Sequence, residues 1–248
     1  MPGDYAVLAP VYDVAGLSTF STTIIPSLLT YILQRGWMGR NILELGSGTG
    51  LTLRWIKHQG YNISGVDNSP EMIQQAQKQT YAVPLYQQDV RRLEFNNDND
   101  LVIALNLLNE LDSLRDLEAT FKGVQQALKA GQMFVFDLQT LEGLAKSGNS
   151  ERLFYDSPDS LTMFTRSTYD YERQLLNTQY LLYRQEEGQS LWQRSQAEQT
   201  LRGYPVQAVL GLLQRTGFEL TGVLNGALAA YDPGKSGVDR VIVVAKRV

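Results

Sequence analysis

One stretch near the start of the chain limits the possible folds more than any other. The apolar run Asn41–Leu45 leads into the glycine-rich segment Gly46–Gly50. A short apolar run closed by glycines is typical of a buried parallel strand followed by a tight turn, and residues 51–59 then fit a helix that stops at Gly60. Such a turn aims backbone amides at the start of a helix towards a ligand. The three glycines alone fit a simple turn equally well.

The alternation of strand and helix patterns continues along most of the chain. Apolar runs predict further strands at residues 61–66, 83–87, 101–105, 133–136, 218–223 and 238–245. Apolar residues at helical spacing predict helices at residues 17–36, 51–59, from 70 onward, 111–129 and 206–215. Strands that alternate with helices form a parallel sheet covered on both faces. We therefore expect an α/β fold, a Rossmann-like doubly wound seven-stranded sheet whose last hairpin is antiparallel.

Residues 151–204 follow a different pattern, because apolar and polar residues alternate there. This alternation predicts antiparallel strands with one buried and one solvated face. We expect residues 1–248 to form a single domain, in which 151–204 is an antiparallel β lid inserted after the fifth strand. Aromatic-rich strands also pair subunits, so the alternative for this segment is the interface of a homodimer.

Composition and charge narrow the classes of function. The 248 residues carry a net charge of −4 and show no basic stripe, so a nucleic-acid partner is not expected. There is no cysteine and one histidine, His58, which excludes cysteine nucleophiles, Cys-ligated clusters and multi-histidine metal sites. The N-terminus lacks a secretory pattern, and no apolar run approaches about 18 residues. We expect a cytoplasmic protein without a metal or a membrane partner.

Two acidic residues near the glycine segment indicate the kind of ligand. Asp67 lies 23 positions after Glu44 (67 minus 44), at the end of the next predicted strand, where a carboxylate can accept hydrogen bonds from a ribose diol. An acid at this place often caps a helix, but Ser69 already fills that role ahead of Pro70. The glycine spacing is G-x-G-x-G, whereas a dinucleotide site has G-x-G-x-x-G. A carboxylate at Glu44 suits a cationic ligand, not a pyrophosphate.

Four motifs, in order and at the expected spacing, give the chain a resemblance to a known family. The motifs are Glu44-Leu-Gly-Ser-Gly-Thr-Gly50, Gly65-Val-Asp-Asn-Ser-Pro-Glu-Met-Ile73, Gln88-Asp-Val90 and Asp100-Leu-Val-Ile-Ala-Leu-Asn-Leu-Leu-Asn-Glu-Leu111. Over roughly residues 40–140, the chain resembles the class I S-adenosylmethionine-dependent methyltransferases. The segment Tyr5–Asp13 is similar to the N-terminal segment of small-molecule members, which folds over the cofactor.

The resemblance implies that S-adenosylmethionine is the cofactor, and it implies a contact for each matching residue. Glu44, Gly46, Ser47 and Gly48 would contact the methionine part of the cofactor. Asp67, Asn68 and Met72 would contact the adenosine, with Asp67 on the ribose. Asp89 and Val90 would contact the adenine. The backbone at Asn106 would face the sulfonium, and Tyr12, with Tyr5 beside it, would close over the amino-acid end. Simple packing is the alternative role for Tyr12.

Departures from several relatives narrow the choice of methyl acceptor. Methyltransferases that act on base nitrogens have two prolines after the fourth strand, where this chain has Asn106–Asn109. Protein arginine methyltransferases use two glutamates there, and this chain has only Glu110. Cytosine and arsenic methylation need cysteines. The resemblance therefore implies transfer of a methyl group from S-adenosylmethionine to an oxygen or nitrogen of a small-molecule acceptor.

The sequence does not identify a catalytic base. His58 lies in the helix after the glycine segment and is expected to face solvent, and Asp137 is either an acceptor contact or a turn residue. Two other functions stay open: a nicotinamide-dependent oxidoreductase on the same core, and a non-catalytic S-adenosylmethionine-binding protein. We expect aromatic side chains of the lid to wall the acceptor pocket, among them Phe154, Tyr155, Phe164, Tyr169, Tyr171, Tyr180, Tyr183 and Trp192.

Overall fold

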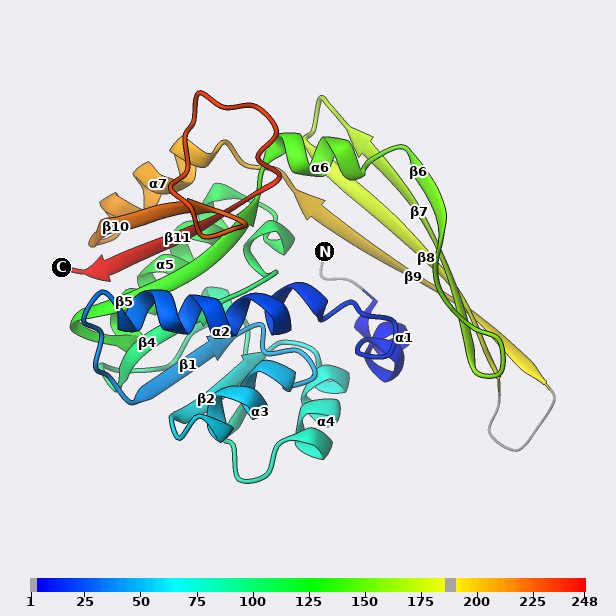
Figure 1. Ribbon diagram of the computed structural model, residues 1–248, viewed down its shortest axis with the longest axis horizontal. Coiled ribbons are helices and arrows are strands. Elements are labelled where there is room, and N and C mark those ends of the chain that lie inside the picture. The colour runs from blue at the N-terminus through cyan, green and yellow to red at the C-terminus, as the bar shows by residue number, and fades with distance from the viewer. Residues whose placement is uncertain (1–3, 186–190) are drawn as a thin grey trace.

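The computed structural model describes residues 4–185 and 191–248, and its strands form two separate sheets. The strands are β1 (Asn41–Leu45), β2 (Asn62–Asp67), β3 (Leu85–Gln87), β4 (Asn99–Ala104), β5 (Leu128–Gln139), β6 (Ser150–Ser157), β7 (Leu161–Asp170), β8 (Leu175–Gln185), β9 (Trp192–Arg202), β10 (Phe218–Asn225) and β11 (Arg240–Arg247). The larger sheet has the order β10-β11-β5-β4-β1-β2-β3, and the smaller has the order β6-β7-β8-β9 (Figure 1).

Helices surround the larger sheet and connect its strands. They are α1 (Tyr5–Leu8), α2 (Thr19–Leu33), α3 (Leu51–His58), α4 (Pro70–Gln79), α5 (Leu114–Ala127), α6 (Leu141–Ser147) and α7 (Val206–Arg215), with short 3-10 turns η1 (Ala9–Val11), η2 (Val90–Arg92) and η3 (Leu108–Glu110). Strands β1 to β5 pair in parallel, whereas β11 pairs antiparallel with both β5 and β10. The prediction of a seven-stranded, mostly parallel sheet with an antiparallel last hairpin is confirmed.

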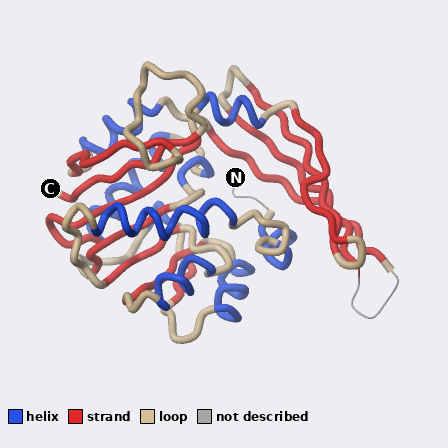
Figure 2. The backbone as a smooth tube through the Cα atoms, viewed as in Figure 1, coloured by secondary structure: helices blue, strands red, loops and turns tan. Residues whose placement is uncertain are grey.

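The two faces of the larger sheet are buried beneath different helices. On β4, Val102 and Ala104 face the cluster formed with α5 and α7, whereas Leu101 and Ile103 face the cluster formed with α2 and α3. Each side chain lies on one face because successive residues of a strand point in opposite directions. Figure 2 shows these helices on both sides of the strands. A sheet buried on both faces explains why the strands are near-continuous apolar runs.

Polar side chains cap the starts of two helices that flank the larger sheet. Ser69 precedes α4, and its Oγ accepts a hydrogen bond from the Met72 N–H at 3.2 Å. Ser113 precedes α5 and accepts from the Asp116 N–H at 3.1 Å. Each cap satisfies a backbone donor that has no partner within its helix. The cap predicted at Ser69 is thereby confirmed.

The smaller sheet extends away from the core on the side where β5 ends (Figure 1). Its four strands pair antiparallel, as predicted for 151–204; residues 186–190 of that segment lie outside the described residues. Leu8 and Val11, from α1 and η1, pack against Met163 of this sheet. Residues 4–11, the start of the described chain, therefore lie between the small sheet and the core. No helix within the described ranges has the length and apolar character to span a membrane.

Two details of the chain after the fourth strand differ from expectation. The helix predicted over 111–129 begins at Leu114 and ends at Ala127, because Leu128 pairs with Asn99 in the sheet. Helix α6 was not predicted. Its seven residues are few for an amphipathic pattern, and it begins where the Thr140 hydroxyl accepts from the Gly143 N–H at 3.0 Å.

Candidate functional site

A cavity of about 410 Å³ opens at the carboxyl edge of the larger sheet, where β1, β2 and β4 end. All eleven residues predicted to contact the cofactor line it: Tyr12, Glu44, Gly46, Ser47, Gly48, Asp67, Asn68, Met72, Asp89, Val90 and Asn106. They come together because the carboxyl ends of parallel strands meet at one edge of the sheet. Their shared position supports the predicted contacts, which remain predictions.

The glycine segment forms an open cradle in the floor of this cavity. Gly46 and Gly48 have φ angles of +65° and +53°, in the left-handed region that glycine adopts without strain. A Cβ atom at Gly48 would meet no other heavy atom within 4 Å, so the backbone there borders open space. The Ser47 N–H donates to the Val66 carbonyl at 3.0 Å and ties the cradle to β2. Bare main chain is therefore available to a ligand.

Glu44 places a buried carboxyl group beneath the cradle. Its side chain is 3% exposed, and its Oε2 has no hydrogen-bond partner. Burial raises the pKa of Glu44 to about 8, although a hydrogen bond from Thr52 lowers it. The buried hydroxyl of Ser47 also lacks a partner. Buried polar atoms normally have partners. This pair therefore fits a ligand that brings its own donors, and the ammonium group of S-adenosylmethionine is such a donor.

Asp67 lies at the end of β2 and faces the same cavity. Its Oδ2 accepts from the Gly48 N–H at 2.8 Å, and its Oδ1 accepts from the Ser69 N–H at 2.9 Å. Burial raises the pKa of Asp67, and these backbone hydrogen bonds oppose the rise. A carboxylate oxygen can accept a second hydrogen bond, so each oxygen can still receive a ribose hydroxyl.

Asp89 and Val90 lie at the far end of the cavity, on either side of the start of η2. The Asp89 carboxylate accepts from the Arg91 guanidinium at 2.6 Å and from the Arg91 N–H at 2.9 Å. These hydrogen bonds hold the pKa of Asp89 below its usual value. Val90 is buried, so it presents an apolar side chain to this end of the cavity. An acid beside an apolar residue suits the edge and face of a base.

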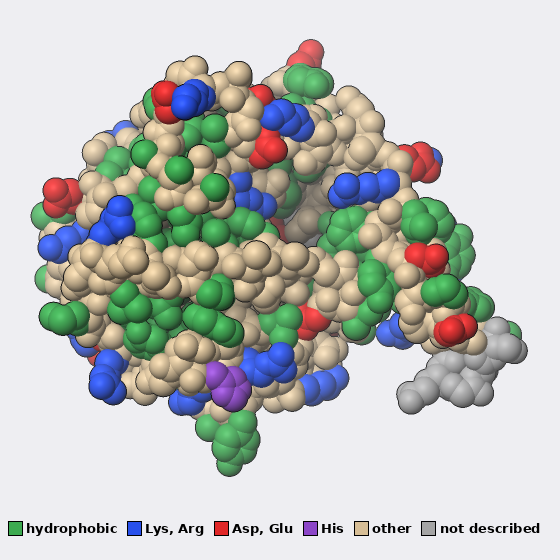
Figure 3. Space-filling view, in the orientation of Figure 1, with side chains coloured by type: hydrophobic (Ala, Val, Ile, Leu, Met, Phe, Trp, Pro, Cys, Tyr) green, Lys and Arg blue, Asp and Glu red, His purple; other side chains and the backbone are tan. Residues whose placement is uncertain are grey.

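A second cavity, of about 640 Å³, lies between the small sheet and the core. Figure 3 shows a hollow in this region. Tyr12 and Asn106 line both cavities, so the two spaces meet at these residues. The second cavity has mostly polar walls, whose residues include Asn109, Gln139, Arg152, Thr165, Ser167, Thr178, Tyr180, Gln199 and Arg240.

Asn106 is held firmly where the two cavities meet. Its φ angle is +57°, which an asparagine tolerates better than most residues. Its N–H donates to Asp137 Oδ1 at 2.6 Å, and its Oδ1 accepts from Arg240 at 2.6 Å. Arg240 also pairs with Asp137 and lies over the ring of Phe20, 3.8 Å from the centroid. Asp137 is 1% exposed and lines neither cavity, which favours a structural role over the acceptor contact that the sequence left open.

A hydrogen-bonded group of three side chains adjoins this meeting point. Glu110 Oε1 accepts from the hydroxyl of Tyr5 and, at 2.7 Å, from Gln199 Nε2. Burial raises the pKa of Glu110 to about 7, although these two hydrogen bonds lower it. Glu110 and Tyr5 line the first cavity, and Gln199 lines the second. The sequence showed Glu110 only as a single glutamate after the fourth strand. Its partners Tyr5 and Gln199 lie far from it in the sequence, so the sequence alone could not indicate this hydrogen-bonded group.

Other sequence expectations about the site have mixed outcomes. His58 is exposed on α3, as expected. Among the eight aromatic residues expected to wall the acceptor pocket, Phe154 and Tyr180 line the second cavity. Phe164, Tyr171 and Trp192 are exposed, so the expectation is wrong for these three. Phe164 and Trp192 lie on faces of the small sheet that the alternation alone could not assign to solvent, and Tyr171 follows the end of β7.

Comparisons with known proteins agree with this fold. Residues 42–131 match the model of the methyltransferase domain family. "Putative methyltransferase YqeM" of Bacillus subtilis is 33% identical over 104 residues, a match that covers 40% of this chain. The match spans 42% of that protein, less than half of its length.

Solved structures share the fold over more of the chain. An S-adenosylmethionine-dependent methyltransferase of Clostridium acetobutylicum superposes with a TM-score of 0.79 at 21% identity, over 98% of both chains. The sugar N-methyltransferase KedS8 of a Streptoalloteichus species superposes with a TM-score of 0.69 at 19% identity, over 84% of this chain and 80% of its own. At these identities the likeness shows the fold.

Fold and site together define a Rossmann-like protein with a cofactor cavity at the carboxyl edge of its sheet. Within that class, residues 42–131 match the methyltransferase domain family, and the relatives and solved structures support the class I S-adenosylmethionine-dependent methyltransferase that the motifs predicted. S-adenosylmethionine is the cofactor of that class, and the unpartnered polar atoms of the cradle fit it.

Proposed function

We propose that the chain is an enzyme that binds S-adenosylmethionine in the first cavity and transfers its methyl group to a nitrogen atom of a small molecule held in the second. One observation carries this proposal: the two cavities meet at Tyr12 and Asn106, so ligands in them would touch there. Enzymes gain much of their rate from holding two reactants in contact and in line.

The chain's own residues hold the cofactor at both of its ends. Glu44 and Ser47 receive the amino-acid end, Asp67 the ribose, and Asp89 with Val90 the adenine. When bound, S-adenosylmethionine supplies a methyl group on a sulfonium that is a good leaving group. Asn106, fixed through its N–H to Asp137, keeps the border where the two cavities meet in place.

Glu110 is the group that we propose accepts the acceptor's proton. Its pKa of about 7 favours an amine over an aliphatic hydroxyl as the acceptor. Taking a proton from an aliphatic ammonium with a pKa of about 10.4 costs such a carboxylate about 5 kcal/mol, whereas a hydroxyl with a pKa of about 15.7 costs about 12 kcal/mol. The smaller cost favours an amine. A structure of this fold is named a sugar N-methyltransferase, which is consistent with an amine acceptor.

The small sheet and the start of the chain exclude water from the reaction in this proposal. Residues of both line the second cavity, among them Leu8, Leu17, Tyr180 and Leu201. Exclusion of water strengthens the electrostatic interactions in a site and prevents competing hydrolysis. The predicted role of 151–204 as a lid is part of this proposal.

The test measures cofactor binding and methyl transfer separately. S-adenosylmethionine and NAD are titrated into the protein by calorimetry, and a panel of small amines and matched alcohols is then incubated with S-adenosylmethionine. Products are read by mass spectrometry. We expect binding of S-adenosylmethionine and not of NAD, and methylated products from amines. The rate should fall as the pH drops below about 7, because Glu110 then takes up a proton.

Two variants show whether Glu110 acts in the reaction. Glu110→Gln should lower kcat by roughly a hundredfold or more, the usual effect of a lost general base, and leave cofactor affinity nearly unchanged. Glu118→Gln on α5 is the matched control, because Glu118 is a partly exposed glutamate that pairs with Lys122 and lines neither cavity. Tight NAD binding without S-adenosylmethionine binding would indicate an oxidoreductase. Cofactor binding without any methylated product would indicate a non-catalytic binding protein.

A further inference from the structure

The face of the small sheet that looks towards the core is apolar at its ends and polar in the middle. On β7, Leu161 and Met163 pack against the start of the chain, and Tyr169 packs against Leu144 of α6. Between them, Thr165 and Ser167 are 5% and 8% exposed and line the second cavity. Packing alone would favour apolar side chains at these two buried positions, because a buried hydroxyl without partners is costly.

The polar stretch continues across neighbouring strands. Thr165 pairs with Arg152 on β6 and with Tyr180 on β8, and Ser167 pairs with Ser150 and Thr178. We call the side chains at this level that line the second cavity the hydroxyl band: Ser150, Thr165, Ser167, Thr178, Tyr180 and Gln199. Directly paired residues of a sheet point to the same face, so the band is one continuous polar surface.

The band retains hydrogen-bonding capacity for a ligand. Within it, the hydroxyls of Ser167 and Thr178 lie 3.0 Å apart and share one hydrogen bond, and the Tyr180 hydroxyl donates to Gln199 Oε1 at 3.1 Å. A hydroxyl can donate one hydrogen bond and accept two. These contacts use only part of that capacity. A ligand with several hydroxyl groups would use the rest.

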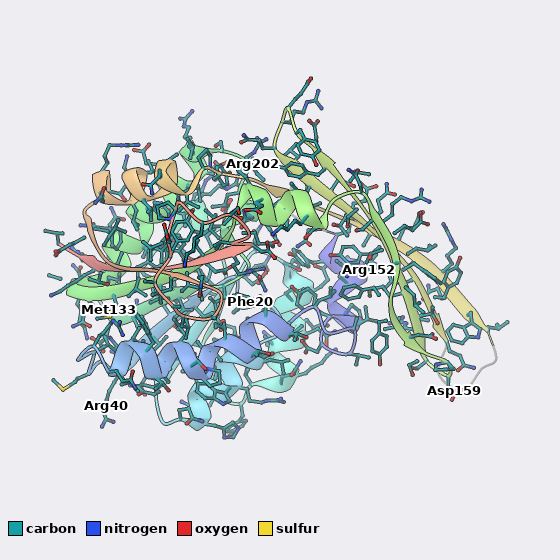
Figure 4. All side chains as sticks on the ribbon, turned by 45° about the horizontal axis from the view of Figure 1, so that its top comes forward. Phe20, Arg40, Met133, Arg152, Asp159 and Arg202 are labelled. Carbon is teal, nitrogen blue, oxygen red and sulfur yellow. The ribbon has the colours of Figure 1, made fainter. Side chains whose placement is uncertain are left out.

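Arg152 stands at the edge of the band and is the cation that the cavity leaves without a counter-charge. The other two cations in the walls are paired: Arg240 with Asp137, and Lys146 with Asp239 and Glu142. Among the described residues, no hydrogen bond or ion pair engages Arg152. Its guanidinium lies 5.4 Å from the ring centroid of Phe154. Figure 4 shows Arg152 on a lid strand and Phe20, another wall residue, across from it at the start of α2.

We propose that the second cavity is built for an acceptor that carries both hydroxyl groups and an anionic group, either carboxylate or phosphate. The guanidinium of Arg152 binds the anion through its parallel N–H donors, which match the geometry of both groups. The hydroxyl band binds the hydroxyls. This inference rests on the proposed function in one respect, that the second cavity receives the acceptor.

Binding of matched ligands tests the inference without requiring turnover. With S-adenosylhomocysteine in the first cavity, calorimetry measures the affinity for glucosamine, glucosamine 6-phosphate and 2-amino-2-deoxygluconate. Glucosamine has no anionic group, glucosamine 6-phosphate carries a phosphate, and 2-amino-2-deoxygluconate carries a carboxylate. We expect at least one anionic ligand to bind about tenfold or more tightly than glucosamine, the gain of a charge-assisted hydrogen bond. Comparing the two anionic ligands shows whether phosphate or carboxylate is preferred.

Three substitutions locate the effect. Arg152→Gln should remove the advantage of the anionic ligand and leave glucosamine unaffected. Arg166→Gln is the control, because Arg166 is an exposed arginine on β7 that pairs with Glu151. Thr165→Val keeps the shape of the side chain, and it should weaken all three ligands by about fivefold, the effect of one hydrogen bond.

Each outcome has one meaning. Equal binding of neutral and anionic ligands to the wild-type protein, no binding of any of the three, or equal losses in the two arginine variants would each overturn the inference. Mass spectrometry of the same mixtures with S-adenosylmethionine tests the proposed function separately. Anion binding that depends on Arg152 without methylated product would refute the proposed function and leave this inference standing. Methylation that is unaffected by Arg152→Gln would refute this inference and leave the proposed function standing.

Discussion

Glu44→Gln should weaken binding of S-adenosylmethionine by an amount that depends on pH. The substitution keeps the shape of the side chain and removes its charge. In the wild-type protein, Glu44 has a pKa of about 8 because it is buried, and its Oε2 has no partner. The cationic cofactor binds the ionised form. At pH 9 that form dominates, and losing a hydrogen bond between charged groups, about 1.5–3 kcal/mol, weakens binding by about 10- to 150-fold.

The difference should shrink as the pH falls. At pH 7, only about one tenth of the wild-type protein carries an ionised Glu44 before binding, so its apparent affinity is about tenfold below the intrinsic value. The wild-type advantage over Glu44→Gln then falls to about 1- to 15-fold. The amino group of S-adenosylmethionine titrates in both proteins alike, so the ratio of the two affinities isolates Glu44. Calorimetry at pH 6, 7, 8 and 9 measures this ratio.

Stability without cofactor gives an independent reading of the same pKa. A carboxyl group whose folded-state pKa is raised contributes stability that is present below its unfolded pKa of about 4.5 and is lost as the pH rises to about 8. The melting temperature of Glu44→Gln relative to the wild-type protein should therefore rise across this window. A ratio of affinities that is constant from pH 6 to 9, with a constant difference in melting temperature, would refute the reasoning.

Three further substitutions probe the structure. Asp67→Ala should weaken cofactor binding by about 1–3 kcal/mol in calorimetry, because it removes the acceptor for the ribose; unchanged affinity would contradict the assigned contact. Asp137→Ala leaves Arg240 without its buried partner and should lower the free energy of unfolding in urea by about 3–5 kcal/mol. A loss below about 1 kcal/mol would show that the pair is not needed for stability. Phe121→Ala removes a fully buried ring from the core and should cost about 3–5 kcal/mol of unfolding free energy. Its cofactor affinity should stay near wild type, and a large loss of affinity would mean that the core and the site are coupled.

The parts of the fold that depend on local pattern could be predicted from the sequence. The bounds of β1 and α7 agree with expectation to the residue, because a buried apolar run and an amphipathic period each carry their own signal. That the predicted cofactor residues line one cavity was predictable for a related reason. Its residues follow the ends of successive strands, and parallel topology alone brings those ends together.

The parts that depend on distant partners could not be predicted in this way. Glu110 gains its role from Tyr5 and Gln199, which lie 105 and 89 positions away. Asp137 is a candidate acceptor contact by its position near the end of a strand, but it pairs with Arg240, which lies 103 positions away in the sequence. The hydroxyls on β7 were visible as polar residues at positions that should be apolar. That signal, an interrupted period of two, is a clue to the polar part of the second cavity, beside the aromatic residues Phe154 and Tyr180.

The position of the chain's start between the small sheet and the core has a consequence for how the protein is made. The Glu198 N–H donates to Asp4 Oδ2 at 2.9 Å across a separation of 194 residues, and Leu8 packs against Leu182. During synthesis, Asp4 and Leu8 therefore wait for partners on β8 and β9, which follow much later in the chain. Contacts between such distant parts form slowly. The walls of the second cavity are consequently complete only after these strands are made, whereas strands β1 to β5 of the parallel core precede them in the chain.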